Sequence, residues 1–104
     1  MKALVQLDID GSQARIEIRG SVDTRNVKAL YILARRANSL APGLDIVLDL
    51  KRATVQPEAM EQLLECSEAR QLPRRVDPDQ FECRLSITPA ARLVRTPAGV
   101  ALAA

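Results

Sequence analysis

Histidine and tryptophan are absent from the sequence, and Tyr31 and Phe81 are its only aromatic residues. Without histidine the chain lacks the side chain that most often moves protons near neutral pH, so Ser/His/Asp and Cys/His nucleophile arrangements are excluded. Scarce aromatic residues argue against a surface that stacks single-stranded nucleic acid. Leu, Ile, Val and Ala must therefore supply nearly all of the buried area of any core.

Glycine and cysteine are also scarce. The four glycines are too widely scattered for a P-loop or a dinucleotide-binding fingerprint. The two cysteines, Cys66 and Cys83, show no C-x-x-C spacing and have no histidine to complete an ordinary Cys/His zinc site. We predict two buried, reduced thiols, one in a helix and one in a strand, and neither a metal nor a cofactor.

Strong net charge and long apolar runs are missing too. A net charge of +2 is too small to attract DNA or an anionic membrane over long range. Met1-Lys2 leads directly into an alternating segment, so we expect no secretory signal, no membrane insertion and a cytoplasmic location. The 104 residues, with 47% apolar and 27% charged content, predict a single globular domain over residues 1–104.

The first half of the chain predicts a hairpin followed by a helix. Residues 3–9 and 14–19 alternate between apolar and polar side chains, as half-buried strands do, and Asp10-Gly11 between them favours a tight turn. We expect the hairpin to have one apolar face. An amphipathic helix of roughly four turns follows, capped by Ser21, Asp23 or Thr24 and ending near residues 41–43.

The second half alternates between strands and helices. Residues 44–50 predict a more central strand, parallel to the one before the first helix because a crossover connects them. A second helix begins near Pro57, and its predicted inner stripe comprises Met60, Leu63, Leu64 and Ser67. Residues 70–80 predict an exposed loop.

The end of the chain predicts one more strand and one more helix. Residues 81–87 alternate, with Phe81 on the apolar side, and Thr88-Pro89 is a typical helix start. The predicted fold is α/β: a mixed four-stranded sheet packed by about three helices, in the order β-β-α-β-α-β-α.

Carboxylate pairs are the remaining candidates for chemistry. Asp8 with Asp10 and Asp45 with Asp49 are the closest pairs on predicted strands. Their even spacing places each pair on the expected solvent face, which explains them without a catalytic role. We predict that the chain is not an enzyme. A small carboxylate-based enzyme or ligand-binding domain is the alternative from another class, and it requires a concave pocket with convergent polar groups.

Two short motifs, taken with the order of elements, resemble the STAS domain of bacterial anti-sigma factor antagonists. In that family the second strand ends in Gly-x-hydrophobic-Asp, matched here by Gly20, Val22 and Asp23. The strand after the first helix carries hydrophobic-Leu-Asp-Leu, matched by residues 47–50. The resemblance covers roughly residues 3–100. It implies a protein-binding module in the regulation of transcription.

The sequence departs from the family at one functional position. Antagonists carry Asp-Ser-Ser-Gly or a close relative at the start of the second helix, where the anti-sigma kinase phosphorylates a hydroxyl. Here Gln56, Pro57, Glu58 and Ala59 occupy those places, so no hydroxyl remains. Glu58 could imitate the phosphorylated residue, but Pro followed by Glu is also what a first helical turn prefers, and we favour that explanation.

The resemblance also implies where a partner binds. The implied docking residues fall in two segments of the chain: Asp23, Thr24 and Arg25 in the first, and Thr54, Gln56, Pro57, Glu58, Ala59 and Glu61 in the second. The expected partner is another protein, either an anti-sigma factor kinase or a larger assembly such as a transporter or stressosome in which the domain is a constitutive scaffold. We expect no nucleic-acid partner, and a homodimer is possible.

Overall fold

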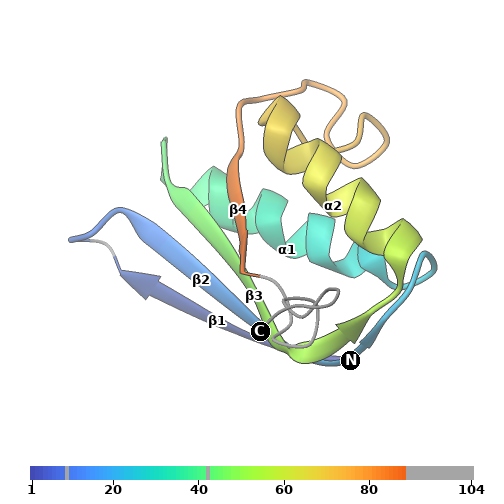
Figure 1. Cartoon of the computed structure of the whole chain (residues 1–104). Helices are drawn as coiled ribbons and strands as arrows, with labels where there is room; N and C mark the ends of the chain where they lie inside the picture. The colour runs from blue at the N-terminus through green and yellow to red at the C-terminus, as the bar shows by residue number, and fades with distance from the viewer. Residues whose placement is uncertain (9, 42, 89–104) are drawn as a thin grey trace.

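A computed structural model describes residues 1–8, 10–41 and 43–88 of the chain (Figure 1). The elements follow the order β1 (Lys2–Asp8), β2 (Gln13–Val22), α1 (Val27–Leu40), β3 (Asp45–Val55), α2 (Pro57–Ala69) and β4 (Arg84–Thr88). The four strands form one mixed sheet in the order β1-β2-β3-β4, with β1 antiparallel to β2 and the other neighbours parallel. The predicted α/β class, mixed four-stranded sheet and opening hairpin are confirmed.

Both described helices cover the same face of the sheet (Figure 1). The connection through α1 moves the chain from β2 to β3, and the connection through α2 moves it one strand further in the same direction. When successive crossover connections have the same handedness and move along the sheet in the same direction, their helices lie on the same face of the sheet. The other face is left without a helix among the described residues, and we call it the open face.

The core lies between the two helices and the face of the sheet that they cover. Alternate residues of β2 and β3, such as Ile16 and Leu48, are cross-strand neighbours and are almost completely buried. From α1 the predicted positions Val27, Leu30 and Tyr31 pack against them. Among the described residues, the core is aliphatic apart from Tyr31 and the two cysteines, as the composition requires.

Several predicted burial patterns are wrong. All seven residues of β1 are exposed, including Val5 and Leu7, so the hairpin's apolar face is buried only on β2. In α2 the buried residues are Ala59, Leu63 and Cys66, whereas Leu64 is 48% exposed. Leu63 is buried as predicted, but the other buried positions hold Ala59 and Cys66, whose side chains are smaller than those of Met60 and Leu64, and a pattern based on the largest apolar side chains does not find them.

The segment between α2 and β4 also differs from the prediction. Phe81 is 64% exposed and precedes β4, which begins at Arg84. Residues 70–80 are irregular as predicted, but the segment is only partly exposed, because Leu72, Val76 and Asp77 are buried. Asp77 accepts the N–H of Phe81 at 3.1 Å, and this closes a turn. This hydrogen bond, together with the buried side chains, holds the loop against the domain.

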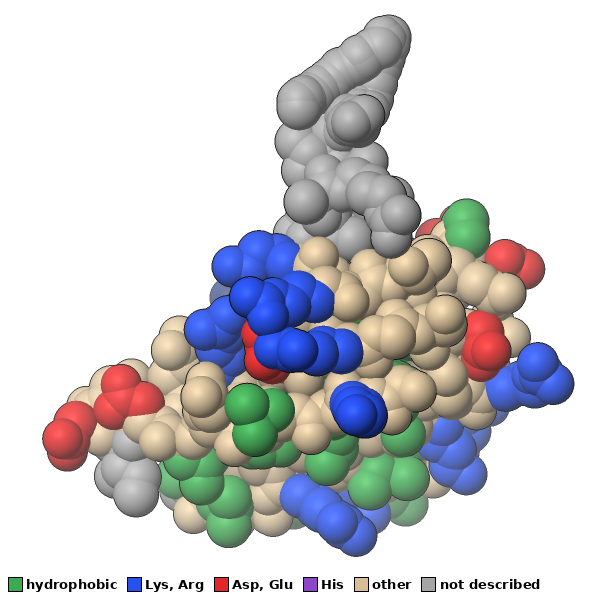
Figure 2. Space-filling view, turned by 90° about the horizontal axis from the view of Figure 1, so that it is seen from below, with side chains coloured by type: hydrophobic (Ala, Val, Ile, Leu, Met, Phe, Trp, Pro, Cys, Tyr) green, Lys and Arg blue, Asp and Glu red, His purple; other side chains and the backbone are tan. Residues whose placement is uncertain are grey.

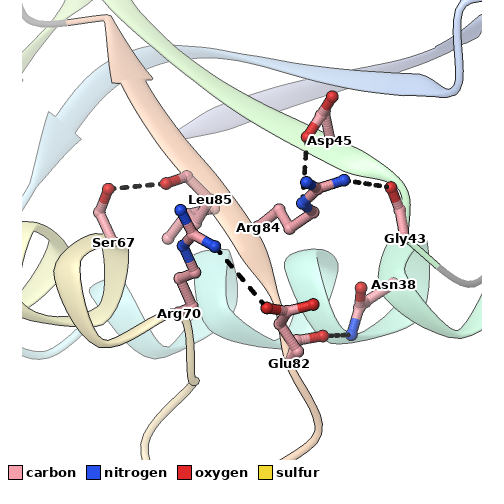
Figure 3. Close-up of polar contacts among 8 residues, drawn as sticks. All are labelled: Asn38, Gly43, Asp45, Ser67, Arg70, Glu82, Arg84 and Leu85. Atoms are coloured by element: carbon pink, nitrogen blue, oxygen red, sulfur yellow. Dashed lines mark hydrogen bonds and ion pairs between the residues drawn. The ribbon is translucent and has the colours of Figure 1, made fainter.

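Polar contacts fix the start of β4 against its neighbours (Figure 3). Ser67 in α2 donates to the Leu85 carbonyl at 2.6 Å, and Asn38 in α1 donates to the Glu82 carbonyl at 2.9 Å. Arg84 lies 3.8 Å from the Asp45 carboxylate on β3. Each of these contacts ties β4 or its approach to a different element, so this short edge strand is held from three directions.

Two helices are found in the part of the chain that the structure describes, against about three expected. The expected third helix would run from Pro89 onward and falls outside the described residues, while Thr88, its expected cap, is the last residue of β4. Across residues 1–8, 10–41 and 43–88, no helix is long and apolar enough to cross a membrane.

Candidate functional site

The two segments expected to contact a partner lie side by side at one edge of the sheet. Strands β2 and β3 are parallel, and their last residues Val22 and Val55 are direct neighbours. The backbone N–H of Gln56 then donates to the Val22 carbonyl at 2.9 Å, which joins the two exits. We call the exposed and partly exposed residues of these exits the carboxyl-edge surface: Asp23, Thr24, Arg25, Thr54, Gln56, Pro57, Glu58 and Glu61.

Asp23 and Asn26 hold the loop between β2 and α1 through a reciprocal pair of hydrogen bonds. The Asp23 carboxylate accepts the N–H of Asn26 at 2.9 Å, and the Asn26 side-chain oxygen accepts the N–H of Asp23 at 2.8 Å. The same carboxylate oxygen accepts the N–H of Arg25 at 2.9 Å. These bonds satisfy free N–H groups before the helix, so Asp23 shapes the loop that presents Thr24 and Arg25 to solvent.

The electrostatics of Asp23 agree with this structural role. The backbone hydrogen bond from Asn26 lowers the pKa of Asp23, and the bond from Arg25 adds to the effect against the opposing influence of burial. The role of Asn26 was not predicted from the sequence. The signal was present, because Asp23 and Asn26 are three residues apart, which is the spacing of the two partners in a capping box.

The second exit differs in two ways from the prediction. Strand β3 continues to Val55 instead of ending at residue 50, so Thr54 is an exposed strand residue. Helix α2 begins at Pro57 as predicted, with Gln56 in an extended conformation before it and Glu58 exposed in the first turn. Ala59 is fully buried, so its side chain cannot belong to a contact surface.

Charges of both signs occupy the carboxyl-edge surface. Arg25 follows β2, and Glu58 and Glu61 lie at the start of α2, all three exposed. Glu58 lies in the first turn of α2, where the positive end of the helix dipole stabilises it. A partner that binds across both segments therefore meets one basic and one acidic region a short distance apart.

The carboxylates expected on the solvent face have different environments. Asp45 is exposed as predicted. Asp49 is buried, which contradicts the prediction, because Arg15 on β2 donates to its carboxylate and folds over it. Burial alone would raise the pKa of Asp49, but the hydrogen bonds from Arg15 and from the N–H of Lys51 outweigh it, and the pKa lies below its usual value.

Ion pairs join neighbouring strands on the open face, and Figure 2 shows the molecule from below with its side chains coloured by type. Lys and Arg side chains gather around an acidic side chain in the middle of this view, and hydrophobic side chains are spread over the half of the molecule below them. Asp49 pairs with Arg15, and Asp45 with Arg84, so each carboxylate of this predicted pair is engaged by an arginine of a neighbouring strand. Both carboxylates therefore have a structural explanation in holding the strands together.

A polar groove lies at the opposite edge of the sheet from the carboxyl-edge surface. It has a volume of about 430 Å³ and is lined by residues that include Gln13, Asp45, Ser67, Arg70 and Arg84. Figure 3 shows how Arg84 and Arg70 are directed toward acidic partners, Asp45 and Glu82. This is the concave polar region that the ligand-binding alternative would use, but both of its arginines already face carboxylates, so it shows no unpaired charge for a ligand.

Neither cysteine is placed for chemistry. Cys66 and Cys83 are buried and free, as predicted, but Cys83 directly precedes β4 instead of lying in a strand. Burial raises the pKa of both thiols, that of Cys83 to about 11. A thiol of this kind is a weak nucleophile at neutral pH. Within the described residues, no group of three or more His, Cys, Asp or Glu side chains could hold a metal ion.

Searches of protein-family models, curated proteins and solved structures find no match to this chain. The resemblance to STAS domains accordingly rests on the order of strands and helices, together with the short sequence motifs at residues 20–23 and 47–50.

Proposed function

We propose that the chain is a protein-interaction module of the anti-sigma factor antagonist type that binds its partner through the carboxyl-edge surface. The observation that carries this proposal is the hydrogen bond between Gln56 and Val22, which places both implied docking segments at one edge. Segments far apart in the sequence then form one continuous exposed surface. A surface that spans two rigid strand ends suits recognition of a folded partner.

We further propose that phosphorylation at the usual position does not control this binding. The first turn of α2 contains Pro57, Glu58 and Ala59, and none of them offers a hydroxyl. Glu58 carries one permanent negative charge there, less than the nearly two charges of a phosphate. The interaction would then depend on the concentration of the partner and not on a kinase.

The experiment combines co-purification with two surface variants. Arg25→Glu and Glu58→Lys reverse one exposed charge in each segment, and Glu68→Lys makes the same change further along the exposed side of α2. We expect Arg25→Glu and Glu58→Lys to reduce capture of the partner and Glu68→Lys to leave it unchanged. Equal capture by all variants would refute the proposed surface.

The identity of the captured species separates the two forms of the proposal. A sigma-factor regulator brings down a small kinase-like protein, whereas a scaffold brings down a large complex. Incubation with that kinase and ATP, followed by mass spectrometry, tests the second part. Phosphate on any of residues 54–61, where Thr54 is the only hydroxyl, would refute control without phosphorylation.

A further inference from the structure

Strand β1 is an exposed edge with an apolar composition. Among the described residues only β2 pairs with it, and its other side has no neighbouring strand. Leu4, Val5 and Leu7 are 53%, 41% and 48% exposed, respectively. Edge strands of this kind offer unpaired backbone groups to another strand, and monomeric proteins usually protect them.

The sequence of β1 is complementary to itself when read in the opposite direction. With Val5 opposite Val5 of a second copy, Lys2 lies opposite Asp8, Ala3 opposite Leu7 and Leu4 opposite Gln6. The two ends of the strand carry opposite charges, so an antiparallel pair brings each Lys2 to an Asp8. We propose that β1 pairs with β1 of a second copy of this chain in this register, around a two-fold axis at Val5.

The charges select this register over its neighbours. A shift of two residues keeps the same faces together but places Lys2 opposite Gln6 or Leu4 opposite Asp8, which removes both oppositely charged pairs. Within one chain Lys2 lies opposite Arg19 of β2, a neighbour of like charge. Asp8 of the second copy would offset that repulsion from the other side.

Apolar side chains on the helix-covered face support the same pairing. Ala3, Val5 and Leu7 lie on that face because their β2 neighbours are the buried residues Ile18, Ile16 and Ala14. Leu40 at the end of α1 is 66% exposed, and with Leu7 it lines an apolar groove of about 300 Å³. Pairing places a second set of Ala3, Val5 and Leu7 beside the first and extends the apolar layer across the axis.

The symmetry makes the assembly closed. A two-fold pair uses both β1 edges and leaves none for a third copy, so the product is a dimer with one continuous sheet and not a fibre. This inference is independent of the proposed partner binding, which uses the carboxyl-edge surface.

The test uses the whole chain and two variants. We expect each variant alone to dimerise weakly and an equimolar mixture of the two to form a mixed dimer. Lys2→Glu places two acidic residues opposite each other at both ends of the pair, and Asp8→Lys places two lysines there. Because two symmetry-related pairs change sign together, we expect each variant to dimerise about tenfold more weakly than the wild type, or worse. In an equimolar mixture the glutamate introduced into one variant meets the lysine introduced into the other, so a mixed dimer forms.

Analytical ultracentrifugation and native mass spectrometry measure these species. Lys28→Glu on the exposed side of α1 makes the same change in net charge as Lys2→Glu and should leave the dimer intact. Asp8 also accepts the N–H of Gly11 at 3.0 Å, so Asp8→Lys could disturb the hairpin turn. Val5→Asp therefore provides a further variant, since Val5 is exposed and the two acidic side chains would meet on the axis; we expect a monomer.

Three results would overturn the proposal. A wild-type chain that remains a monomer at concentrations approaching about 1 mM has no such interface of useful affinity. A dimer that tolerates Val5→Asp is held by some other surface. Folded Lys2→Glu and Asp8→Lys variants that form no mixed dimer would exclude the antiparallel register.

Discussion

Asp49 provides a quantitative test of how the open face stabilises the sheet. The Asp49→Asn substitution keeps the size of the side chain and one acceptor oxygen but removes the negative charge. In the folded chain the Asp49 carboxylate accepts one hydrogen bond from the Arg15 side chain and another from the backbone N–H of Lys51, the latter at 3.1 Å. The Asp49 side chain is only 4% exposed. The substitution therefore weakens a charged hydrogen bond at a buried acceptor.

The expected cost follows from these contacts. A hydrogen bond to a charged group contributes about 1.5–3 kcal/mol, whereas a fully exposed ion pair contributes about 0.2–1 kcal/mol. The Arg15 side chain is 44% exposed, so the pair lies between these limits. We expect the free energy of unfolding to fall by about 1–2 kcal/mol at neutral pH, and the melting temperature by about 4–8 °C for each kcal/mol.

The pH dependence gives the sign of the effect. The pKa of Asp49 is lower in the folded chain than the value of about 3.9 in the unfolded chain. The stabilisation is therefore complete above the unfolded pKa and disappears as the pH falls through the folded pKa. Urea denaturation of both proteins should show a constant difference from about pH 5 to pH 8 and a difference that shrinks as the pH falls below the unfolded pKa of about 3.9.

Two further variants test the reasoning. Arg15→Gln combined with Asp49→Asn in a double-mutant cycle should give a coupling energy that accounts for most of the cost of Asp49→Asn alone. Asp45→Asn is the matched control, because Asp45 is exposed and lies 3.8 Å from Arg84, and it should cost less than about 0.5 kcal/mol. A cost for Asp49→Asn that does not shrink at any pH below the unfolded pKa of about 3.9 would show that the charge does not stabilise the sheet.

Three further predictions concern the contributions of Leu63, Gly20 and Cys83 to the free energy of unfolding. Leu63→Ala removes a fully buried side chain and should lower the free energy of unfolding by about 2–4 kcal/mol, against less than about 1 kcal/mol for the half-exposed Leu64→Ala, both measured in urea. Gly20→Ala should cost about 1–2 kcal/mol in the same assay, because Gly20 has φ = 98° and an added Cβ would lie 3.2 Å from the Met1 Cα. Ionisation of the unfolded thiol should reduce stability from about pH 8.5 until the folded pKa of Cys83, about 11, is reached, and Cys83→Ala should reduce this alkaline loss.

Local pattern predicted most of the fold correctly. The hairpin, the two described helices and the parallel central strands follow from periodicity, turn residues and the crossover rule. Burial on β1 was not predictable in this way, because the alternation of Val5 and Leu7 is the same whether or not a helix lies above the strand. The reach of the helices across the sheet is a tertiary property.

The candidate site shows the same division. The sequence placed Pro57 at the start of α2, and strand topology brought residues 23–25 next to it. The burial of Asp49 depends on Arg15, which is separated from it by 34 positions and reaches over it from another strand. Side-chain periodicity within one strand carries no information about such a contact.

The Gln56 amide, which joins the two exits, also couples their motions. Because the proton on the Gln56 nitrogen is held by the carbonyl of Val22, it exchanges with water only when one of the two loops moves away from the other. A ligand that binds to either loop would slow the exchange of this amide proton with water. The NMR signal of the Gln56 amide proton would therefore report the binding of a ligand to either of the two loops.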